Sequence, residues 1–365
     1  MRIALLYHQF ITKGGLEGYL REFAGQLRAA GHEVVLVTSR VDGALRDLAA
    51  EVRLIPPAWT ARGTLRKFAE RSAALVPELK ADAVLGFGRT WRQDIHRAGG
   101  GCHWHYSRML PWWKRWKAKN RWELAAERRL YTGGGTRLFV VNSAKVRAEL
   151  AEAYAVPPER VHVIRTAVDT RRWQPAADAG TRAALRERLG MTDGAPSFLF
   201  ASLDHRRKGL GTLLRALSLV PDARLWVAGQ KLDAWQGQIH RFGLAGRVTG
   251  VGRADLLPYF QAADWFVHPT HYDACANTVL QSMACGLPGI ISSGDGAAEF
   301  IRPGENGLIL RNPDSPDELA AHLRTALGHS PETRAPLAAA ARGTMLPLTW
   351  ASHLGQWMRL LGADR

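Results

Sequence analysis

Residues 267–293, VHPTHYDACANTVLQSMACGLPGIISS, place a run of small side chains where a helix is expected to begin. An apolar strand ends at His268, and the pattern predicts a helix from about Ala276 to Cys285. The first N–H groups of a helix have no partner within it, and small neighbours let a phosphate reach them. The segment therefore predicts a phosphate site with three candidate residues, Ala276, Asn277 and Thr278.

Two polar side chains of this segment suit a sugar nucleotide. Asp273, in the loop before the helix, can accept hydrogen bonds from sugar hydroxyls, and Gln281, on the helix itself, can hydrogen-bond a ribose. Asp273 is therefore a catalytic candidate. The sequence contains no Asp-x-Asp motif, so we expect the site to work without a metal.

The segment LDHRRKGLGTLLRAL, residues 203–217, gathers cations at the end of a predicted strand. Arg206, Arg207 and Lys208 come just before a helix that should begin near Gly209. Arginine can bind two phosphate oxygens, lysine adds a point charge, and together they neutralise charge that develops on a leaving nucleotide. A solvated basic helix start is the alternative. The position after a strand favours a diphosphate site, with Lys208 as a catalytic as well as a binding residue.

A glycine pair, Gly14 and Gly15, follows the first expected strand and precedes a helix that includes Leu16. Such a pair lets an anion approach a helix N-terminus closely, although a simple tight turn explains it equally well. The three-glycine dinucleotide fingerprint is missing, which argues against a nicotinamide dehydrogenase.

Candidate proton acceptors lie in residues 89–106, RTWRQDIHRAGGGCHWHY, which contain Asp94, His96, His103 and His105. A hydroxyl nucleophile benefits from a nearby base. We predict Asp94 first and His103 second in this role, on the acceptor side. A structural or surface role is the alternative for each histidine.

Residues 103–130 interleave five tryptophans with eight cations, against only Glu123 and Glu127. Tryptophan favours the lipid headgroup level, and lysine and arginine are attracted to anionic lipid. The predicted membrane contacts are Trp112, Trp113, Lys114, Arg115, Trp116, Lys117 and Lys119. Single-stranded nucleic acid, whose bases stack on aromatic rings, is the alternative partner, but it leaves the predicted diphosphate site unexplained.

These residues require a scaffold of strands alternating with helices. Residues 2–7, RIALLY, precede a helical pattern at 16–30 and a second apolar run at 33–39, and the alternation restarts after 173–196 with SFLFAS. This order predicts an α/β protein with two Rossmann-like, doubly wound parallel sheets that face an interdomain cleft. The expected parts are residues 1–168, residues 169–348 and a C-terminal helix, residues 349–365, which can pack back on the first domain.

Composition narrows the class of protein. A chain of 365 residues, 46% of them hydrophobic, can form two cores, and a net charge of +16 implies a polyanionic partner. Cys102, Cys275 and Cys285 lack metal-ligand spacing and are expected as reduced thiols. No apolar run approaches the roughly 20 residues of a membrane span, and the N-terminus does not resemble a signal peptide, so we expect a cytoplasmic protein.

The arrangement H-P-x(3)-D in residues 268–273, followed by GLPGIISS, resembles the retaining glycosyltransferases of family 4, which have the GT-B fold. The resemblance extends to residues 14–16, 168–172 and 207–209, and covers nearly the whole chain. It is greatest with the lipopolysaccharide core glucosyltransferase I group, which uses UDP-glucose. That likeness depends on the Arg207-Lys208 pair and on the basic aromatic segment.

The resemblance implies that the backbone groups of Gly15 and Leu16, together with Arg207 and Lys208, hold the donor diphosphate. The full predicted donor site adds Gly14, Arg172, Ala276, Asn277, Thr278 and Gln281. In such a site Asp273 contacts the donor sugar and Gln281 the ribose. The family usually has glutamate at both of these positions, so this chain carries a shorter acid at one and a neutral amide at the other. The leaving phosphate is thought to assist the incoming hydroxyl, so no protein nucleophile is required.

The sequence thus predicts a retaining, metal-independent hexosyltransferase that needs no cofactor. Its partners would be a nucleotide diphosphate sugar, UDP-linked, a lipid-linked or lipopolysaccharide core acceptor, and anionic lipid headgroups at the inner face of the cytoplasmic membrane; nucleic acid is not expected. The alternatives are a glycosyltransferase of a capsule, exopolysaccharide or glycolipid pathway, a sugar-nucleotide hydrolase or epimerase on the same fold, and a nucleic-acid-binding protein.

Overall fold

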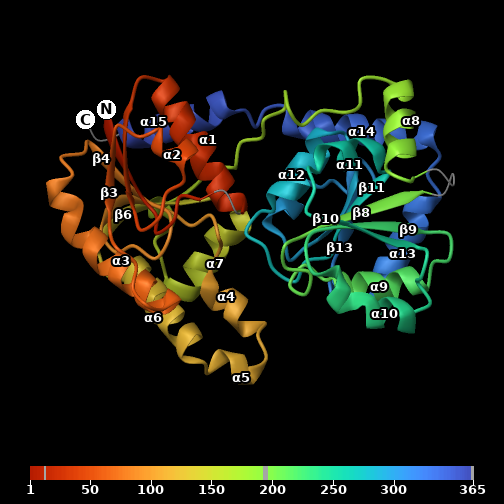
Figure 1. Ribbon diagram of the computed structural model, residues 1–365, viewed down its shortest axis with the longest axis horizontal. Coiled ribbons are helices and arrows are strands. Elements are labelled where there is room, and N and C mark those ends of the chain that lie inside the picture. The colour runs from red at the N-terminus through yellow and green to blue at the C-terminus, as the bar shows by residue number, and fades with distance from the viewer. Residues whose placement is uncertain (12–13, 192–195, 363–365) are drawn as a thin grey trace. The chain divides into compact units, whose positions relative to one another are not determined.

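The computed structural model describes residues 1–11, 14–191 and 196–362 (Figure 1). The chain divides into two compact units. The first consists of Met1–Thr166 together with Trp350–Arg365, and the second of Ala167–Thr349. Both are α/β units built on parallel sheets, which confirms the predicted fold class.

The first unit contains a seven-stranded parallel sheet in the order β3-β2-β1-β4-β5-β6-β7. Strands β1, β2 and β4 are buried apolar runs, as expected when helices cover both faces of a sheet, whereas the edge strand β3 is partly exposed and β5 is largely polar. The bounds of the strands are β1 Arg2–Leu6, β2 Glu33–Thr38, β3 Glu51–Leu54, β4 Ala83–Gly86, β5 Gln93–Arg97, β6 Thr136–Val141 and β7 Val161–Val163.

Successive residues of a strand point to opposite faces, which divides the helices of this unit into two layers. Ile3 and Leu5 of β1 lie in one core cluster with residues of α1 and α15. Leu6 lies in another with Phe68 of α3. The helices are α1 Gly15–Ala29, α2 Gly43–Arg46, α3 Ala61–Leu75, α4 His103–Arg108, α5 Trp112–Arg115, α6 Ala118–Thr132, α7 Ala144–Tyr154 and α15 Trp350–Gly362.

Helix α15 belongs to the first unit although it follows the second in sequence. His353 faces two partners, the hydroxyl of Tyr19 at 2.9 Å and the carbonyl oxygen of Arg165 at 2.7 Å. The indole of Trp357 is fully buried and donates to His353 at 3.1 Å. Burial lowers the pKa of His353 to about 4, so this histidine is neutral at physiological pH.

The second unit contains a six-stranded parallel sheet in the order β10-β9-β8-β11-β12-β13. Its strands are β8 Ser197–Ala201, β9 Arg224–Ala228, β10 Val248–Gly252, β11 Trp265–His268, β12 Gly289–Ser292 and β13 Gly307–Leu310. Apolar clusters lie on both faces of the sheet: the successive residues Phe198 and Leu199 of β8 point to opposite faces and belong to different clusters. The covering helices are α8 Ala179–Arg188, α9 Leu210–Ser218, α10 Gln236–Arg241, α11 Leu257–Ala262, α12 Asn277–Ala284, α13 Pro316–Leu327 and α14 Pro331–Met345.

Within the described parts of the chain, no helix combines the length and the apolar character needed to cross a bilayer.

Candidate active site

Three loops of the second unit meet at the carboxyl edge of its sheet. Strands β8, β11 and β12 are neighbours, so the loops that follow them leave the sheet side by side. These loops carry Arg207 and Lys208 after β8, Asp273 after β11, and Asp295 after β12. In open parallel sheets, this edge is where ligands bind.

The first two loops are held together by backbone contacts. His271 donates its N–H to the carbonyl of Arg207 at 3.0 Å, and the Arg207 guanidinium donates to the carbonyl of Tyr272 at 2.9 Å. Gly209 has φ +79°, and a Cβ at this position would lie 2.0 Å from the carbonyl oxygen of Pro269. Only glycine therefore permits this close approach.

Lys208 lies at the centre of the cluster and is only 7% exposed. Its ammonium forms an ion pair with the carboxylate of Asp273 and lies 3.2 Å from Nε2 of His268. Arg207 lies 3.6 Å from the same carboxylate. The structure thus brings together three of the predicted donor-site residues, Arg207, Lys208 and Asp273.

Asp295 completes the cluster, and sequence reasoning missed it. Its Oδ1 accepts hydrogen bonds from the backbone N–H groups of Ala276 at 3.0 Å and Ala297 at 2.9 Å, and its Oδ2 lies 3.3 Å from His268 Nε2. The side chain is 1% exposed. An acid directly after a predicted parallel strand was the available signal, because it marks the edge where the other loops end.

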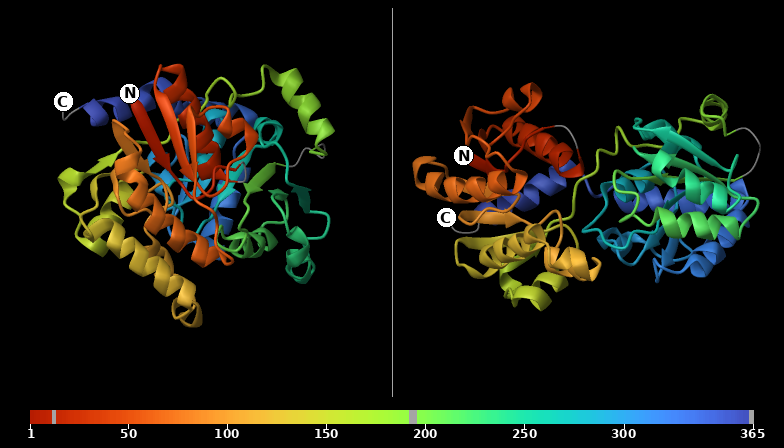
Figure 2. Two further views of the ribbon diagram at one scale, coloured as in Figure 1. Left: turned by 60° about the vertical axis from the view of Figure 1, so that its left-hand side comes forward. Right: turned by 60° about the horizontal axis from the view of Figure 1, so that its bottom comes forward.

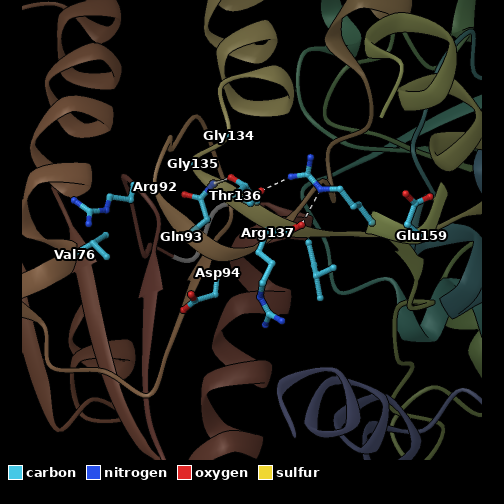
Figure 3. Close-up of a pocket in the computed structure, with 11 residues that line it drawn as sticks. Val76, Arg92, Gln93, Asp94, Gly134, Gly135, Thr136, Arg137 and Glu159 are labelled. Carbon is cyan, nitrogen blue, oxygen red and sulfur yellow. Dashed lines mark hydrogen bonds between the residues drawn. The ribbon is translucent and has the colours of Figure 1, made fainter. Parts of the chain in front are cut away.

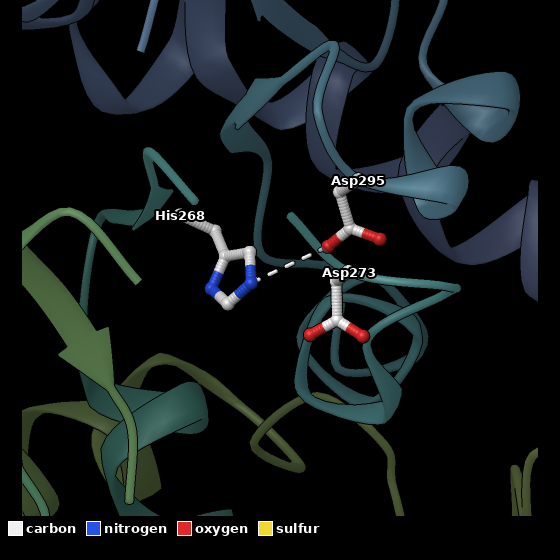
Figure 4. A group of neighbouring side chains, drawn as sticks. All are labelled: His268, Asp273 and Asp295. Carbon is white, nitrogen blue, oxygen red and sulfur yellow. Dashed lines mark ion pairs between the residues drawn. The ribbon is translucent and has the colours of Figure 1, made fainter. Parts of the chain in front are cut away.

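Figure 4 shows the imidazole of His268 directed at Asp295, with Asp273 beside it. One ligand atom from each of these three residues lies within 4.8 Å of the others, a spacing that can hold a metal ion. The cation that these groups surround here is the Lys208 ammonium, which contacts both Asp273 and His268. Burial, together with Lys208 and Arg207, lowers the pKa of His268 well below its usual value, so the imidazole is neutral.

The charge of Lys208 depends on its surroundings. Burial lowers its pKa to about 7, the carboxylate of Asp295 opposes this shift, and the neighbouring Arg207 adds to it. A buried ammonium is retained only when anions compensate its lost hydration. The site therefore holds a cation that titrates near neutral pH.

Helix α12 presents its polar residues on one side, next to this cluster. Asn277, Thr278 and Gln281 are partly exposed, while Val279 and Leu280 are buried. Residues 277 and 281 are one turn apart and share a face. Ala276 is the N-cap and 6% exposed, so the helix start adjoins the Asp295 carboxylate through the Ala276 amide.

Of the other predicted donor residues, Arg172 has different partners within the second unit, and Gly14, Gly15 and Leu16 belong to the first unit. The Arg172 guanidinium forms an ion pair with Asp255 at 3.4 Å and lies over the ring of Trp173, and its backbone N–H donates to the carboxylate of Asp169 at 3.1 Å. Gly14, Gly15 and Leu16 begin α1 in the first unit. A Cβ at Gly14 would lie 2.8 Å from a carboxylate oxygen of Glu17, so the glycine makes room for this acidic side chain.

Asp94 lies at the amino-terminal end of β5, the edge opposite the carboxyl ends of the strands. Its carboxylate accepts the backbone N–H of Val84 at 2.7 Å, and it lines a hollow together with Arg92, Gln93, Thr136 and Arg137 (Figure 3). His103 begins α4 and pairs with the side chain of Asn120 at 2.8 Å. These contacts are structural, and the catalytic roles of Asp94 and His103 stay predictions.

The tryptophan-rich segment forms α4, α5 and most of α6. Trp112, Trp113 and Trp116 are 70%, 53% and 73% exposed. The cations beside them, Arg115, Lys117 and Lys119, are also exposed, and Lys114 is partly so. A folded domain buries such side chains when it can, so three exposed indoles indicate a surface that binds a partner.

In comparison with known proteins, each unit matches a model of glycosyltransferases. The Glycosyltransferase Family 4 model matches residues 13–172, and the Glycosyl transferases group 1 model matches residues 195–329. The chain is 24% identical over 342 residues to lipopolysaccharide glucosyltransferase WaaG of Escherichia coli K12, covering 91% of each chain. It is 28% identical over 375 residues to a D-inositol 3-phosphate glycosyltransferase of Thermobispora bispora, covering 90% of this chain and 85% of that one.

Solved structures show the same fold. The crystal structure of WaaG, a glycosyltransferase involved in lipopolysaccharide biosynthesis, matches with a TM-score of 0.85 at 22% identity, over 98% of this chain and 99% of that one. Anabaena HepE in complex with UDP-glucose matches with a TM-score of 0.79 at 19% identity over the full length of both chains. These likenesses confirm the GT-B type of fold.

Proposed function

Because this chain belongs to glycosyltransferase family 4, we propose that it transfers a hexose from a UDP-sugar to a lipid-linked or lipopolysaccharide core acceptor, with retention of configuration and without a metal. The main support for a UDP-sugar donor is the buried Lys208 at the carboxyl edge of the second sheet. Its ammonium pairs with Asp273, and Arg207 lies beside the same carboxylate.

The donor diphosphate binds beside Arg207 and Lys208, whose charges suit two phosphate groups. On binding, it replaces Asp273 as the anion next to Lys208. The freed carboxylate then accepts hydrogen bonds from hydroxyls of the donor sugar. Gln281, on the partly exposed side of α12, hydrogen-bonds the ribose.

In the transfer step, the bond between the sugar's anomeric carbon and the leaving phosphate oxygen breaks, and a bond to the acceptor hydroxyl oxygen forms on the same face. The proton of the hydroxyl passes to the leaving phosphate oxygen. Arg207 and Lys208 stabilise the charge that develops on the diphosphate, so these cations supply the charge that a metal ion supplies in other enzymes.

Two relatives support the choice of donor and acceptor. The E. coli relative is a lipopolysaccharide glucosyltransferase, and HepE was solved with UDP-glucose. The exposed indoles of Trp112, Trp113 and Trp116 suit an enzyme that works peripherally at the cytoplasmic membrane on a membrane-held acceptor. A second candidate acceptor is an inositol phosphate, favoured by the 28% identity to the T. bispora enzyme.

The donor is tested by thermal unfolding with UDP-, GDP- and ADP-glucose. UDP-glucose should raise the melting temperature, because a ligand at about 100 times its Kd adds about 2.7 kcal/mol of stability. Lys208→Gln should abolish the shift. The matched control is Arg241→Gln, which removes one exposed cation from the same unit and should leave the shift unchanged. The donor proposal is wrong if none of the three sugar nucleotides raises the melting temperature of the wild-type protein.

The acceptor is then tested by transfer of radiolabelled glucose to heptose-containing lipopolysaccharide core or to inositol 3-phosphate. Release of glucose without any acceptor would instead indicate a hydrolase. The anomeric configuration of the product, read by NMR, decides retention. Activity in excess EDTA is expected to equal activity in buffer.

A further inference from the structure

A second exposed tryptophan site lies in the first unit, outside the segment already described. The side chain of Trp59, between β3 and α3, is 106% exposed relative to a reference chain, and Leu54 at the end of β3 is 56% exposed. Residues 53–71 carry five cations, namely Arg53, Arg62, Arg66, Lys67 and Arg71, against Glu70 alone.

Trp59 projects from a turn that is fixed by hydrogen bonds. The hydroxyl of Thr64 accepts the backbone N–H of Ala58 at 3.0 Å and lies 3.1 Å from the Ala58 carbonyl oxygen. Thr60 caps α3 by accepting the N–H of Gly63 at 3.0 Å. The backbone on both sides of Trp59 is therefore hydrogen-bonded, and the indole that projects from this turn is exposed to solvent.

The register of the sheet shows that α3 and α6 cover the same face. Phe68 of α3 packs with Val84 of β4, and Gly86, two residues further along β4, faces the same way. Gly86 pairs with His96 of β5, whose ring lies 6.2 Å from that of Tyr131 in α6. The two helices lie alongside each other in both views of Figure 2.

Both helices connect parallel strands, so both begin at the carboxyl edge of the sheet. Trp59 immediately precedes α3, and α5, with Trp112 and Trp113, immediately precedes α6. The two groups of exposed tryptophans therefore share one edge and one face of the first unit, and each is flanked by cations.

We propose that Trp59, with Leu54 and the cations at the start of α3, is a second anchor that inserts at the headgroup level of an anionic lipid surface. Indole prefers that level, and each nearby lysine or arginine adds attraction to anionic lipid. Two anchors on one face fix the orientation of the unit, whereas α5 alone allows it to pivot. This inference rests on the membrane contact proposed above for α5.

The experiment uses the full-length protein with a Trp59→Cys substitution labelled with an environment-sensitive fluorophore. Labelling is selective, because Cys102, Cys275 and Cys285 are buried. The probe is a phosphatidylcholine vesicle with about 30% phosphatidylglycerol. The label should brighten and shift to the blue on vesicle binding. The matched control is Ala29→Cys, exposed at the end of α1 on the opposite face, which should not respond.

A second measurement is co-sedimentation with the same vesicles. Trp59→Ser should lower the partition coefficient of the protein onto the vesicles about tenfold, because the other membrane contacts remain. The control Leu346→Ser removes an exposed apolar residue from the second unit and should have no effect. The UDP-glucose thermal shift checks that each variant is folded.

The outcomes separate the two claims. Suppose that the triple variant Trp112→Ser, Trp113→Ser, Trp116→Ser loses vesicle binding. If the label on the Trp59→Cys protein then shows no change in fluorescence with vesicles, and Trp59→Ser binds them as wild type does, the second anchor is wrong and the α5 contact stands. If wild type does not bind anionic vesicles, the membrane contact itself is wrong. A response of the same label to a single-stranded RNA oligonucleotide without one to vesicles would overturn the lipid assignment.

Discussion

Lys208 is the residue on which the proposed donor site depends. Its ammonium is buried between the carboxylate of Asp273 and the neutral imidazole of His268. Taking an ammonium out of water is costly unless anions lie close by, and Asp273 supplies such an anion. A diphosphate that enters exchanges one anionic partner for another, so the positive charge need not be exposed to water at any stage.

This residue leads to a prediction about pH. Burial lowers the pKa of Lys208 to about 7, so the free protein loses the cation as pH rises through this value. A diphosphate needs the protonated form. The Kd for UDP-glucose should therefore be constant at low pH and rise up to about tenfold per pH unit above about 7. Isothermal titration calorimetry at a series of pH values measures this Kd. UDP-glucose has no phosphate monoester, so its phosphates do not titrate near pH 7.

Asp295→Asn tests whether the charge of Asp295 sets the pKa of Lys208. Its amide oxygen can still accept the Ala276 and Ala297 N–H groups, but the charge that raises the pKa of Lys208 is gone. The fall in affinity should then begin at lower pH than in wild type. If binding is equally strong from pH 6 to pH 9 in both proteins, Lys208 does not titrate as described.

At the scale of elements, α15 returns the chain to the unit in which it began. Trp357 packs against Phe23 of α1 with ring centroids 5.3 Å apart, and its indole is fully buried. His353 joins α15 to Tyr19 of α1 and to the carbonyl of Arg165 beyond β7. The helix thereby covers one face of the first sheet.

Trp357→Ala should therefore destabilise the first unit. Removal of a large buried aromatic side chain typically costs about 3–5 kcal/mol, through lost apolar burial and the cavity left behind. Urea denaturation followed by circular dichroism measures the loss. Arg359→Ala, on the exposed side of the same helix, should change stability by less than about 0.5 kcal/mol. Equal effects of the two substitutions would mean that α15 does not contribute to the core.

At the scale of the whole molecule, the net charge of +16 and the exposed indoles act together. In the proposed membrane contact, the charge attracts the protein to an anionic surface over a distance of about 10 Å at 0.1 M salt. The indoles of this proposed contact act only at short range, through insertion at the headgroup level. Charge should therefore control how readily the protein reaches the surface, and tryptophan how firmly it stays.

Binding to anionic vesicles should accordingly depend on salt. At about 1 M salt the screening length falls to about 3 Å, so the partition coefficient should drop by an order of magnitude or more between 0.1 M and 1 M NaCl. Co-sedimentation measures it, with vesicles of pure phosphatidylcholine as the control. Equal binding to both kinds of vesicle at all salt concentrations would show that charge plays no part.

Local patterns of the sequence determined the classes of element and three members of the side-chain cluster at the edge of the second sheet. Buried parallel strands appear as short apolar runs and amphipathic helices as a 3.6-residue period, so both sheets could be predicted. Arg207, Lys208 and Asp273 were chosen as candidates because each follows such a run, and the structure brings them together. In contrast, the sequence of β5, QDIHR, has little apolar character, so no apolar run marked the strand that contains Asp94.

Tertiary structure alone decided which of these residues meet. The order β8-β11-β12 brings together loops that are separated by dozens of residues, and only this adjacency joins Asp295 and His268 to Lys208. The same holds for Trp59 and α5, which share an edge because of the sheet register. Spacing along a chain fixes periodicity within one element, whereas contacts between elements depend on strand order and packing, which no local pattern records.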